Sequence, residues 1–435
     1  MNAPVPSNLP RFPFIAVLLV VAVLLLPFGR MVEMPMLLLS IAGVIGLWRR
    51  PSWRGGAPWG CLLLLYIAFV LPMIFSLPDA VAGEKSLLTT IGTLRYGLSC
   101  CALLWFWESG GGEDGGAATV HHAVGLGVAF CLLFWGLDGF WQFLTGHDVL
   151  GYGRGEGYIN ALFGEDDNIK FGITLALLAP LGVIHGFRHW RQPWAWALLL
   201  LCLVMVMLSG KRGAWITLIV ELAAMAAYYR WRGSLDLRRL ALPVLAILLA
   251  LAMAFSASDW VQTRSRVLVN ALDEPSYDQF YAATAKRLPI WGTAWRMGND
   301  NWLNGVGPRG FRYAYSEYAA PDDHWARPAS GAGGSRGSHA HQLLLELYAE
   351  TGVPGLVGYL AIGGLLIGGW LRAGAEARSR AMPYGVALIG MLWPANTHAA
   401  WYSSWSGLLF WFFVGLYLMA LAESPGRSAD PGKGS

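Results

Sequence analysis

Long apolar runs recur along almost the whole of this 435-residue chain, and no other feature restricts its possible folds so strongly. A helix that spans a bilayer needs about 17–25 mostly apolar residues. About twelve runs approach that length, with centres near Val20, Ile41, Ile67, Ser99, Phe134, Leu178, Val204, Val220, Ile247, Ile362, Leu388 and Phe413. Hydrophobic residues make up 55% of the chain and charged residues only 13%, about half the charged fraction of a soluble domain. The sequence therefore predicts an all-α polytopic membrane protein with about twelve transmembrane helices.

Basic residues are concentrated in alternate short connections between these runs. The clusters lie at residues 49–54, 188–191, 230–239 and 372–380. Because cytoplasmic loops carry an excess of Lys and Arg, this pattern places the four connections and both termini in the cytoplasm. The net charge of +4 is small and lies mostly in short loops, which argues against nucleic-acid binding and favours a role of these charges in setting the membrane topology.

The predicted spans divide the chain into four parts. Residues 1–255 form helices 1–9 and include an outer loop at about 146–168. Residues 256–340 form a periplasmic loop domain between helices 9 and 10, because so long a loop is usually functional or folded. Residues 341–422 form helices 10–12, and residues 423–435 form a cytoplasmic tail.

The loop domain has the composition of a folded segment, because its many aromatic residues are unusual in a disordered linker. Residues 282–297 have helical spacing, with Leu288, Trp291, Ala294 and Trp295 near one face. Pro289 in this stretch marks either a kink or the start of the helix.

Neither the thiols nor the acidic runs favour a metal site. The five cysteines lie inside apolar runs, where they act as small buried hydrophobes rather than as disulfides or ligands. The acidic runs at 165–167 and 322–323 could bind a divalent cation. We favour solvated loop caps at both places, so the sequence predicts no metal and no cofactor.

The segment from His341 to Gly355 joins the loop domain to the next apolar run and brings an imidazole to the membrane surface. A His can accept a proton near neutral pH, which suits it to general-base catalysis, although a purely structural role is the common alternative. His339 is a second candidate for the same role. Glu346 and Glu350 lie one helical turn apart at the membrane edge, where unpaired carboxylates are costly. We expect these carboxylates to pair with outer basic groups or to orient the site.

Basic residues on the predicted outer side are unexpected under the positive-inside rule. Arg212, beside Lys211, opens a helix after a short turn, where the helix dipole and free N–H groups favour an anion. Its guanidinium can also bind phosphate in bidentate geometry. Arg287 in the loop domain and Lys170 at the start of an apolar run are further candidates. The alternative is that these side chains reach lipid headgroups, which suits the short, Gly-flanked Arg212 turn least.

Three motifs resemble those of the O-antigen ligase and polymerase superfamily; each is moderately specific alone, and the three in order at this topology are a strong signal. His341 and Gln342, then nine residues and Gly-Val-Pro-Gly at 352–355, are similar to the family's His, then Asn, Ser or Gln, then nine positions and Gly-x-x-Gly. The stretch at 209–215 resembles the family's Ser/Gly-Arg-Gly turn. Arg287 and Trp291, followed by Asn-Gly-Val-Gly-Pro at 304–308, resemble its Arg-x3-Trp block. With the long loop after the ninth span, the resemblance covers most of the chain.

The resemblance implies a glycosyltransferase with a GT-C-like fold in the bacterial inner membrane, with its active site on the periplasmic side. It would transfer O-antigen polysaccharide from undecaprenyl diphosphate to the lipid A–core of lipopolysaccharide, with inversion and without a metal or nucleotide. The residues that this role would assign fall into three groups: His341 or His339 as general base; Arg212, Arg287, Lys211 and Lys170 for the diphosphate; and Trp291, Trp295 and Tyr348 for the sugar or acceptor.

Three other functions share some of these features. An O-antigen polymerase of the same superfamily would use a second lipid-linked chain as acceptor. A protein O-glycosyltransferase is disfavoured because no soluble domain follows Leu421. A lipid or polysaccharide transporter is disfavoured because such folds often contain inverted repeats and broken helices at mid-membrane, and we find no repeat.

Overall fold

The computed structural model describes residues 14–49, 57–111, 116–154, 158–164, 170–188, 193–233, 237–329, 333–397 and 400–422. In these ranges the chain is almost entirely helical, and its only extended pairs are two isolated bridges, between His147 and Gly153 and between Pro328 and Ser335. The all-α prediction is therefore confirmed for this part of the chain.

The helices before residue 258 are α1 (Phe14–Leu24), α2 (Glu33–Arg49), α3 (Ala57–Ser76), α4 (Gly83–Gly92), α5 (Leu94–Phe106), α6 (Gly116–Thr145), α7 (Lys170–Arg188), α8 (Pro193–Leu208), α9 (Arg212–Trp231) and α10 (Leu237–Ala257). Those that follow are α11 (Asp259–Asp273), α12 (Tyr277–Ala283), α13 (Leu288–Asp300), α14 (Phe311–Tyr318), α15 (Leu343–Arg372), α16 (Ala375–Leu392) and α17 (Ser404–Ala422).

Six helical stretches of the described residues are long and apolar enough to cross a membrane: 26–49, 57–76, 83–109, 118–145, 343–372 and 404–422. Four shorter apolar helices accompany them, at 14–24, 170–182, 196–208 and 248–257. These helices indicate a multi-pass membrane protein. Each of the span centres expected from the sequence lies within a helix, but a total of about twelve spans stays a prediction.

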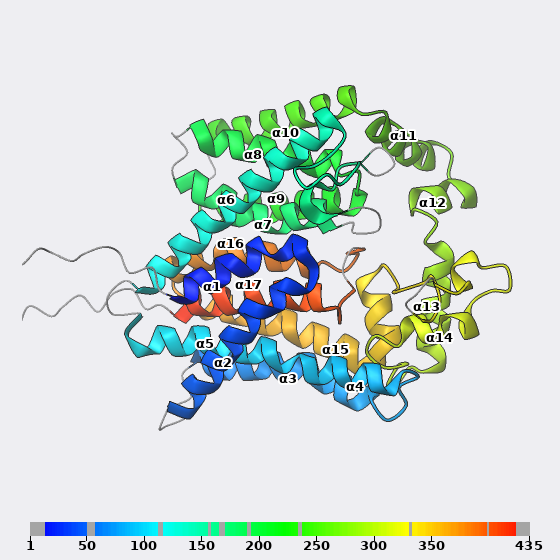
Figure 1. Cartoon of the computed structure of the whole chain (residues 1–435), viewed down its shortest axis with the longest axis horizontal. Coiled ribbons are helices and arrows are strands. Elements are labelled where there is room, and N and C mark those ends of the chain that lie inside the picture. Colours follow the sequence, from blue (N-terminus) through cyan, green and yellow to red (C-terminus); the bar gives the residue numbers. More distant parts are fainter. Residues whose placement is uncertain are drawn as a thin grey trace, which may run out of the picture.

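The long helices run side by side in one bundle, and the chain closes it by returning its last helices to its first (Figure 1). α2 packs along α5, α15 along α3, and α17 against α16 and α5. α6 to α10 form the neighbouring part of the bundle, joined to the rest through contacts of α1 with α6 and of α16 with α7 and α9. The long α17 is buried along almost its whole length, so it lies at the centre of the molecule.

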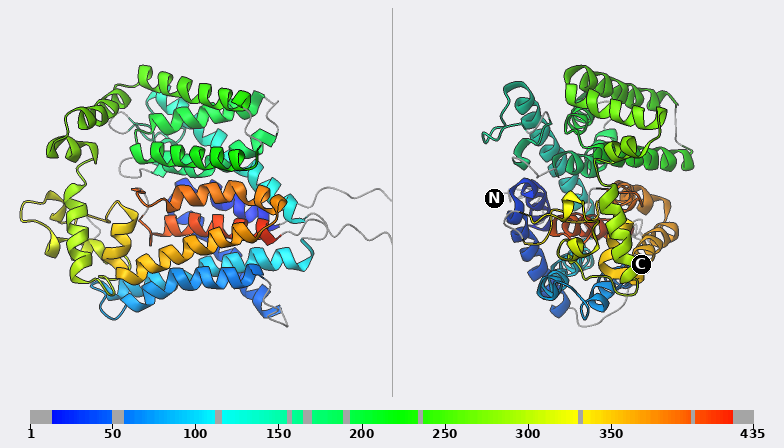
Figure 2. Two further views of the ribbon diagram at one scale, coloured as in Figure 1. Left: turned by 180° about the vertical axis from the view of Figure 1, so that it is seen from behind. Right: turned by 90° about the vertical axis from the view of Figure 1, so that its right-hand side faces the viewer.

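Residues 258–318 form α11 to α14 at one end of this bundle, beyond the ends of the long helices (Figures 1 and 2). Ser258 and Ser276 cap α11 and α12 by accepting a hydrogen bond from the backbone N–H three residues later. α13 begins at Leu288 with Pro289 in its first turn, so the proline starts the helix and does not kink it. Trp295 is 55% exposed and lies off the buried face of α13, contrary to the spacing read from the sequence.

A second, small apolar core joins α13 and α14 to the start of α15. Its buried members are Ile290, Ala294, Met297, Val306, Phe311, Ala314, Tyr315, Ala340 and Ala349. Ala349 belongs to α15, so this core fixes the 256–340 segment to the helix that follows it. Burial of these side chains, at roughly 25 cal/mol per Å² of apolar surface, supplies the stability that the segment needs for a defined structure.

The connection from α13 to α14 docks on a break in α15. Gly352 interrupts the helix with φ +64° and ψ −157°, a backbone conformation open essentially to glycine alone. The freed groups bond to the docked segment: the Val353 N–H donates to the Trp302 carbonyl at 2.8 Å, and the Val306 N–H to the Ala349 carbonyl at 2.9 Å. The break thus lets α15 hold the Gly-Val-Gly-Pro turn at 305–308 against its first turns.

Candidate functional site

The imidazole rings of His339 and His341 lie in contact just before α15. Their ring centroids are 3.7 Å apart at an interplanar angle of 44°, and both side chains are half-buried. His341 has φ +51°, a left-handed conformation that costs a non-glycine residue of the order of 1 kcal/mol. The buried Ala340 between the two histidines packs into the small apolar core, and this packing anchors the turn.

Hydrogen bonds to the connection between α16 and α17 fix this histidine turn further. Gln342 caps α15, since its Oε1 accepts from the Leu345 N–H at 2.6 Å, while its Nε2 donates to the Pro394 carbonyl at 2.8 Å. The Leu343 N–H donates to the Asn396 carbonyl at 3.0 Å. The backbone that directly follows the two imidazoles is therefore held by hydrogen bonds at the start of α15.

Arg212 is the first residue of α9, and its side chain reaches the 256–340 segment. Its Nη2 donates to the Ala282 carbonyl in α12 at 3.4 Å. The preceding Lys211 places its Nζ over the Tyr158 ring, 4.0 Å from the centroid, and Tyr158 in turn packs on Trp260 at 5.8 Å. These contacts hold the basic turn against aromatic rings and against α12.

Lys170 is connected to the same basic turn through helix packing. It is the first residue of α7. Two positions later, Gly172 lies directly against Ser209 and Ala214, which flank the basic pair Lys211 and Arg212. The close approach leaves no room for a Cβ at position 172, which brings Lys170 and the turn at 209–212 to one end of adjacent helices. The acidic residues 165–167 lie outside the described residues.

Arg287 precedes α13 and lies five positions after the residue that Arg212 contacts. Burial lowers the pKa of its guanidinium to about 10, so the group stays protonated at neutral pH. Ala285 and Lys286 before it both have positive φ, 55° and 63°, which turns the chain sharply between α12 and α13. Arg212 therefore contacts the last turn of α12, and Arg287 lies in the connection that follows that helix.

Trp325 links the Arg287 turn to the histidine turn. Its indole Nε1 donates to the Lys286 carbonyl at 3.1 Å, and its own carbonyl accepts from the Gly337 N–H at 3.0 Å. Asp323 holds Trp325 by accepting from its N–H at 2.9 Å and also accepts from the Tyr315 hydroxyl at 2.6 Å. These bonds give Asp323 a structural role in holding the Trp325 turn.

The aromatic candidates occupy α13 and the start of α15. Trp295 is exposed and packs on Tyr348 with ring centroids 5.6 Å apart, while the Tyr348 hydroxyl donates to Asn299 Oδ1 at 3.0 Å. Trp291 lies closer to Arg287, and its Nε1 has no hydrogen-bond partner among the described residues. Trp295 and Tyr348 thus form an exposed platform toward the C-terminal half of α13, whereas Arg287 precedes its N-terminus.

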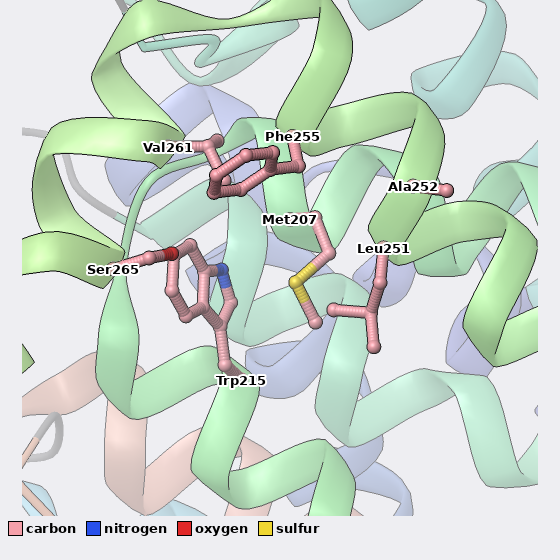
Figure 3. Close-up of a pocket in the computed structure, with 7 residues that line it drawn as sticks. All are labelled: Met207, Trp215, Leu251, Ala252, Phe255, Val261 and Ser265. Carbon is pink, nitrogen blue, oxygen red and sulfur yellow. The ribbon is translucent and has the colours of Figure 1, made fainter. Parts of the chain in front are cut away.

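An apolar cavity of about 300 Å³ lies one turn beyond Arg212, between α8, α9, α10 and α11. Figure 3 shows its lining side chains pointing toward one another: Met207, Trp215, Leu251, Ala252, Phe255, Val261 and Ser265. The Trp215 indole is fixed by donating to the Val206 carbonyl at 3.0 Å. An apolar cavity next to a basic turn can accept a hydrocarbon chain whose head is an anion. Sequence reasoning missed it, because its walls come from four separate helices.

A family model described as O-antigen ligase matches residues 197–360. The match runs from α8 into α15 and includes Arg212, Arg287, His339 and His341. It supports the O-antigen ligase and polymerase superfamily, as the sequence motifs predicted. No curated protein matches the chain.

Proposed function

We propose that this protein transfers O-antigen polysaccharide from undecaprenyl diphosphate to the lipid A–core of lipopolysaccharide, on the periplasmic face of the bacterial inner membrane. The observation that carries the proposal is the shared scaffold of Arg212, Arg287 and the histidine turn. Arg212 bonds to α12, and Trp325 joins the Arg287 turn to the segment before His339. The match at 197–360 spans all of these residues.

The cationic groups would hold the diphosphate of the lipid-linked donor. Guanidinium groups at Arg212 and Arg287 offer bidentate donors, and Lys211 and Lys170 add positive charge at the same end of the bundle. Fixed cations of this kind stabilise the charge that develops on the leaving diphosphate, the role that a metal ion fills in other enzymes. The apolar cavity beside Trp215 would receive the first isoprene units of the lipid.

His341 would act as the general base. It would take the proton from a hydroxyl group of the acceptor sugar as that oxygen attacks the anomeric carbon of the donor. The new glycosidic C–O bond forms while the bond from the anomeric carbon to the diphosphate oxygen breaks, which inverts the configuration. Undecaprenyl diphosphate leaves, and the proton stays on the imidazole until it is released to water. General-base assistance contributes roughly 10²–10⁴-fold to such a step.

His339 would position the base and not replace it. Its Nδ1 lies 3.0 Å from the Ser338 hydroxyl, and its ring packs on that of His341 in a tilted arrangement. The platform formed by Trp295 and Tyr348 would stack on sugar rings, since aromatic faces bind the apolar faces of sugars, and Trp291 would contribute its indole nearer the diphosphate.

The decisive experiment is reconstitution of the purified protein with lipid-linked polysaccharide and lipopolysaccharide core, with EDTA present. We expect a ladder of polysaccharide-bearing lipopolysaccharide, formed without an added metal. Elongation of the lipid-linked polysaccharide alone would assign the polymerase reaction instead. Transfer to a protein would assign O-glycosylation, and movement of lipid across the bilayer without a new bond would assign transport.

A further inference from the structure

A second, polar cavity of about 250 Å³ lies at the end of the bundle where the 256–340 segment docks, and its lining includes none of Arg212, Arg287 and His341. Its walls come from α4 and α5, from the turn before α14 and from the connection between α16 and α17. Figure 1 shows α4 at this end, next to α13, α14 and the start of α15. The cavity shares no lining residue with the apolar cavity beside Arg212.

Three cationic side chains line this cavity, and its described lining contains no carboxylate: they are Lys85, Arg95 and Arg309. Arg95 is rigidly held, because its Nε lies 2.7 Å from Glu33 Oε2 and its Nη2 donates to the Ser404 hydroxyl at 3.1 Å. Glu33 offsets the charge of Arg95, and Glu346 and Glu350 interact electrostatically with Arg309, so the excess positive charge rests mainly on Lys85. Lys85 is exposed and makes no ion pair within the described residues.

The walls of the cavity are attached to α15, the helix that begins next to His341. The N–H groups of Arg309 and Phe311 donate to the buried Glu350 carboxylate at 2.9 and 3.3 Å. The Trp401 N–H donates to Glu346 Oε1 at 2.8 Å. Two carboxylates on one helix therefore hold two of the walls of the cavity, so its shape is linked to the position of the histidine turn.

The cavity offers the chemistry that a phosphate group on a membrane glycolipid requires. Lysine and guanidinium groups bind phosphate oxygens through charge-assisted hydrogen bonds, and hydroxyl groups such as Ser404 add neutral donors. The aromatic rings of Phe69, Trp401 and Tyr402 form the other wall, which suits a sugar ring attached to that phosphate.

We propose that the cavity formed by Lys85, Arg95 and Arg309 binds a phosphate group of the glycolipid acceptor. This inference rests on the proposed function, because it gives the donor diphosphate and the phosphorylated acceptor separate cationic sites at one end of the bundle. The acceptor phosphate would anchor the headgroup while its sugar extends toward His341. The cavity would thus determine which glycolipids are used.

A binding experiment tests the cavity without any need for turnover. The full-length protein in nanodiscs is titrated with a disaccharide glycolipid carrying phosphomonoesters, with the same glycolipid after phosphatase treatment, with phosphatidylglycerol and with inorganic phosphate. We expect the phosphorylated glycolipid to bind at least about tenfold more tightly than the other three, and Lys85→Ala to remove about that factor for this ligand alone. Lys85→Arg should retain binding, and Arg154→Ala, which removes an exposed cation elsewhere, should have no effect.

Equal binding of phosphatidylglycerol or inorganic phosphate would show a general anion site and would overturn the acceptor assignment. Unchanged binding in Lys85→Ala would overturn the site itself. In the transfer assay, Lys85→Ala should raise the KM for the phosphorylated acceptor about tenfold and leave the donor KM unchanged. A change in the donor KM instead would contradict the proposal. Selective glycolipid binding without transfer to any acceptor would contradict the proposed function but leave the binding site standing.

Discussion

At the residue scale, we expect the two imidazoles before α15 to have different roles, and this difference can be measured. We expect His341→Ala to lower the single-turnover rate by roughly 10²–10⁴-fold, because it removes the proposed base and little packing. His339→Ala should reduce the rate less, since it removes only a neighbouring ring whose centroid lies 3.7 Å away. Both variants should keep the wild-type thermal transition in detergent. Normal turnover of His341→Ala, together with an inactive His339→Ala, would reverse the two roles.

Arg287 leads to a pH-dependent prediction. Burial lowers the pKa of its guanidinium to about 10, so the cation is present throughout the neutral range and is lost only as the pH rises through that value. The donor KM should therefore show no contribution from this group below pH ~9 and should increase above pH ~10. In Arg287→Lys we expect a larger donor KM, from loss of bidentate contact, and an increase that begins at lower pH. The reason is that the unperturbed pKa of a lysine, about 10.4, is already below the 12.5 of an arginine, and the same burial lowers it further. Identical pH profiles of the donor KM in the wild type and in Arg287→Lys would remove Arg287 from the diphosphate site.

At the scale of elements, the break in α15 is a requirement of the fold. A Cβ at position 352 would lie 2.6 Å from the Trp302 carbonyl oxygen, and φ +64° with ψ −157° strains any other residue by about 1–3 kcal/mol. Gly352→Ala should therefore lower the thermal transition and the transfer rate together. Gly363→Ala in the same helix is the matched control, because it meets nothing within 4 Å and should change neither. Equal behaviour of the two variants would mean that the docked turn at 305–308 does not depend on the break.

The helices of the bundle could be predicted from the sequence, but the hydrogen bonds that join them could not. Apolar runs predict helices reliably because a bilayer leaves the backbone few other ways to satisfy its hydrogen bonds, and every expected centre lies in one. Glu346 and Glu350 were expected to pair with basic groups or to orient the site. Within the described residues, their hydrogen bonds come from the backbone N–H groups of Trp401, Arg309 and Phe311, although Arg309 is close enough to interact electrostatically with both. No local pattern signals such bonds, because the donors are up to 55 positions away.

The candidate site, too, could be predicted only in part from the sequence. The motifs identified Arg212, Arg287 and His341 because each stands in a short local pattern with its own physical reason. The phosphate cavity of Lys85, Arg95 and Arg309 was not foreseen, since those residues belong to no common motif and meet only through packing. Trp325 was counted only as one of many aromatic residues, yet its two hydrogen bonds join the arginine turn to the histidine turn.

At the scale of the whole molecule, the candidate site residues lie at one end of the bundle. The 256–340 segment and the start of α15 share this end, and the connection between α15 and α16 lies at the other (Figures 1 and 2). Arg212 belongs to the first end through its hydrogen bond to the Ala282 carbonyl. Under the positive-inside rule we expect the first end to face the periplasm. This orientation is necessary for a lipid-linked donor and a glycolipid acceptor to meet outside the cytoplasm.

Single cysteines introduced at the two ends measure this orientation directly. In a background without the native thiols, Lys286→Cys presents an exposed site in the 256–340 segment. Glu376→Cys presents one in the first turn of α16, next to the α15–α16 connection, where the native side chain is 67% exposed. In right-side-out membrane vesicles, a membrane-impermeant maleimide should label Lys286→Cys and should reach Glu376→Cys only after detergent is added. Labelling in the opposite order would place Arg212, Arg287 and His341 on the cytoplasmic side, where a periplasmic glycosyl transfer could not use them.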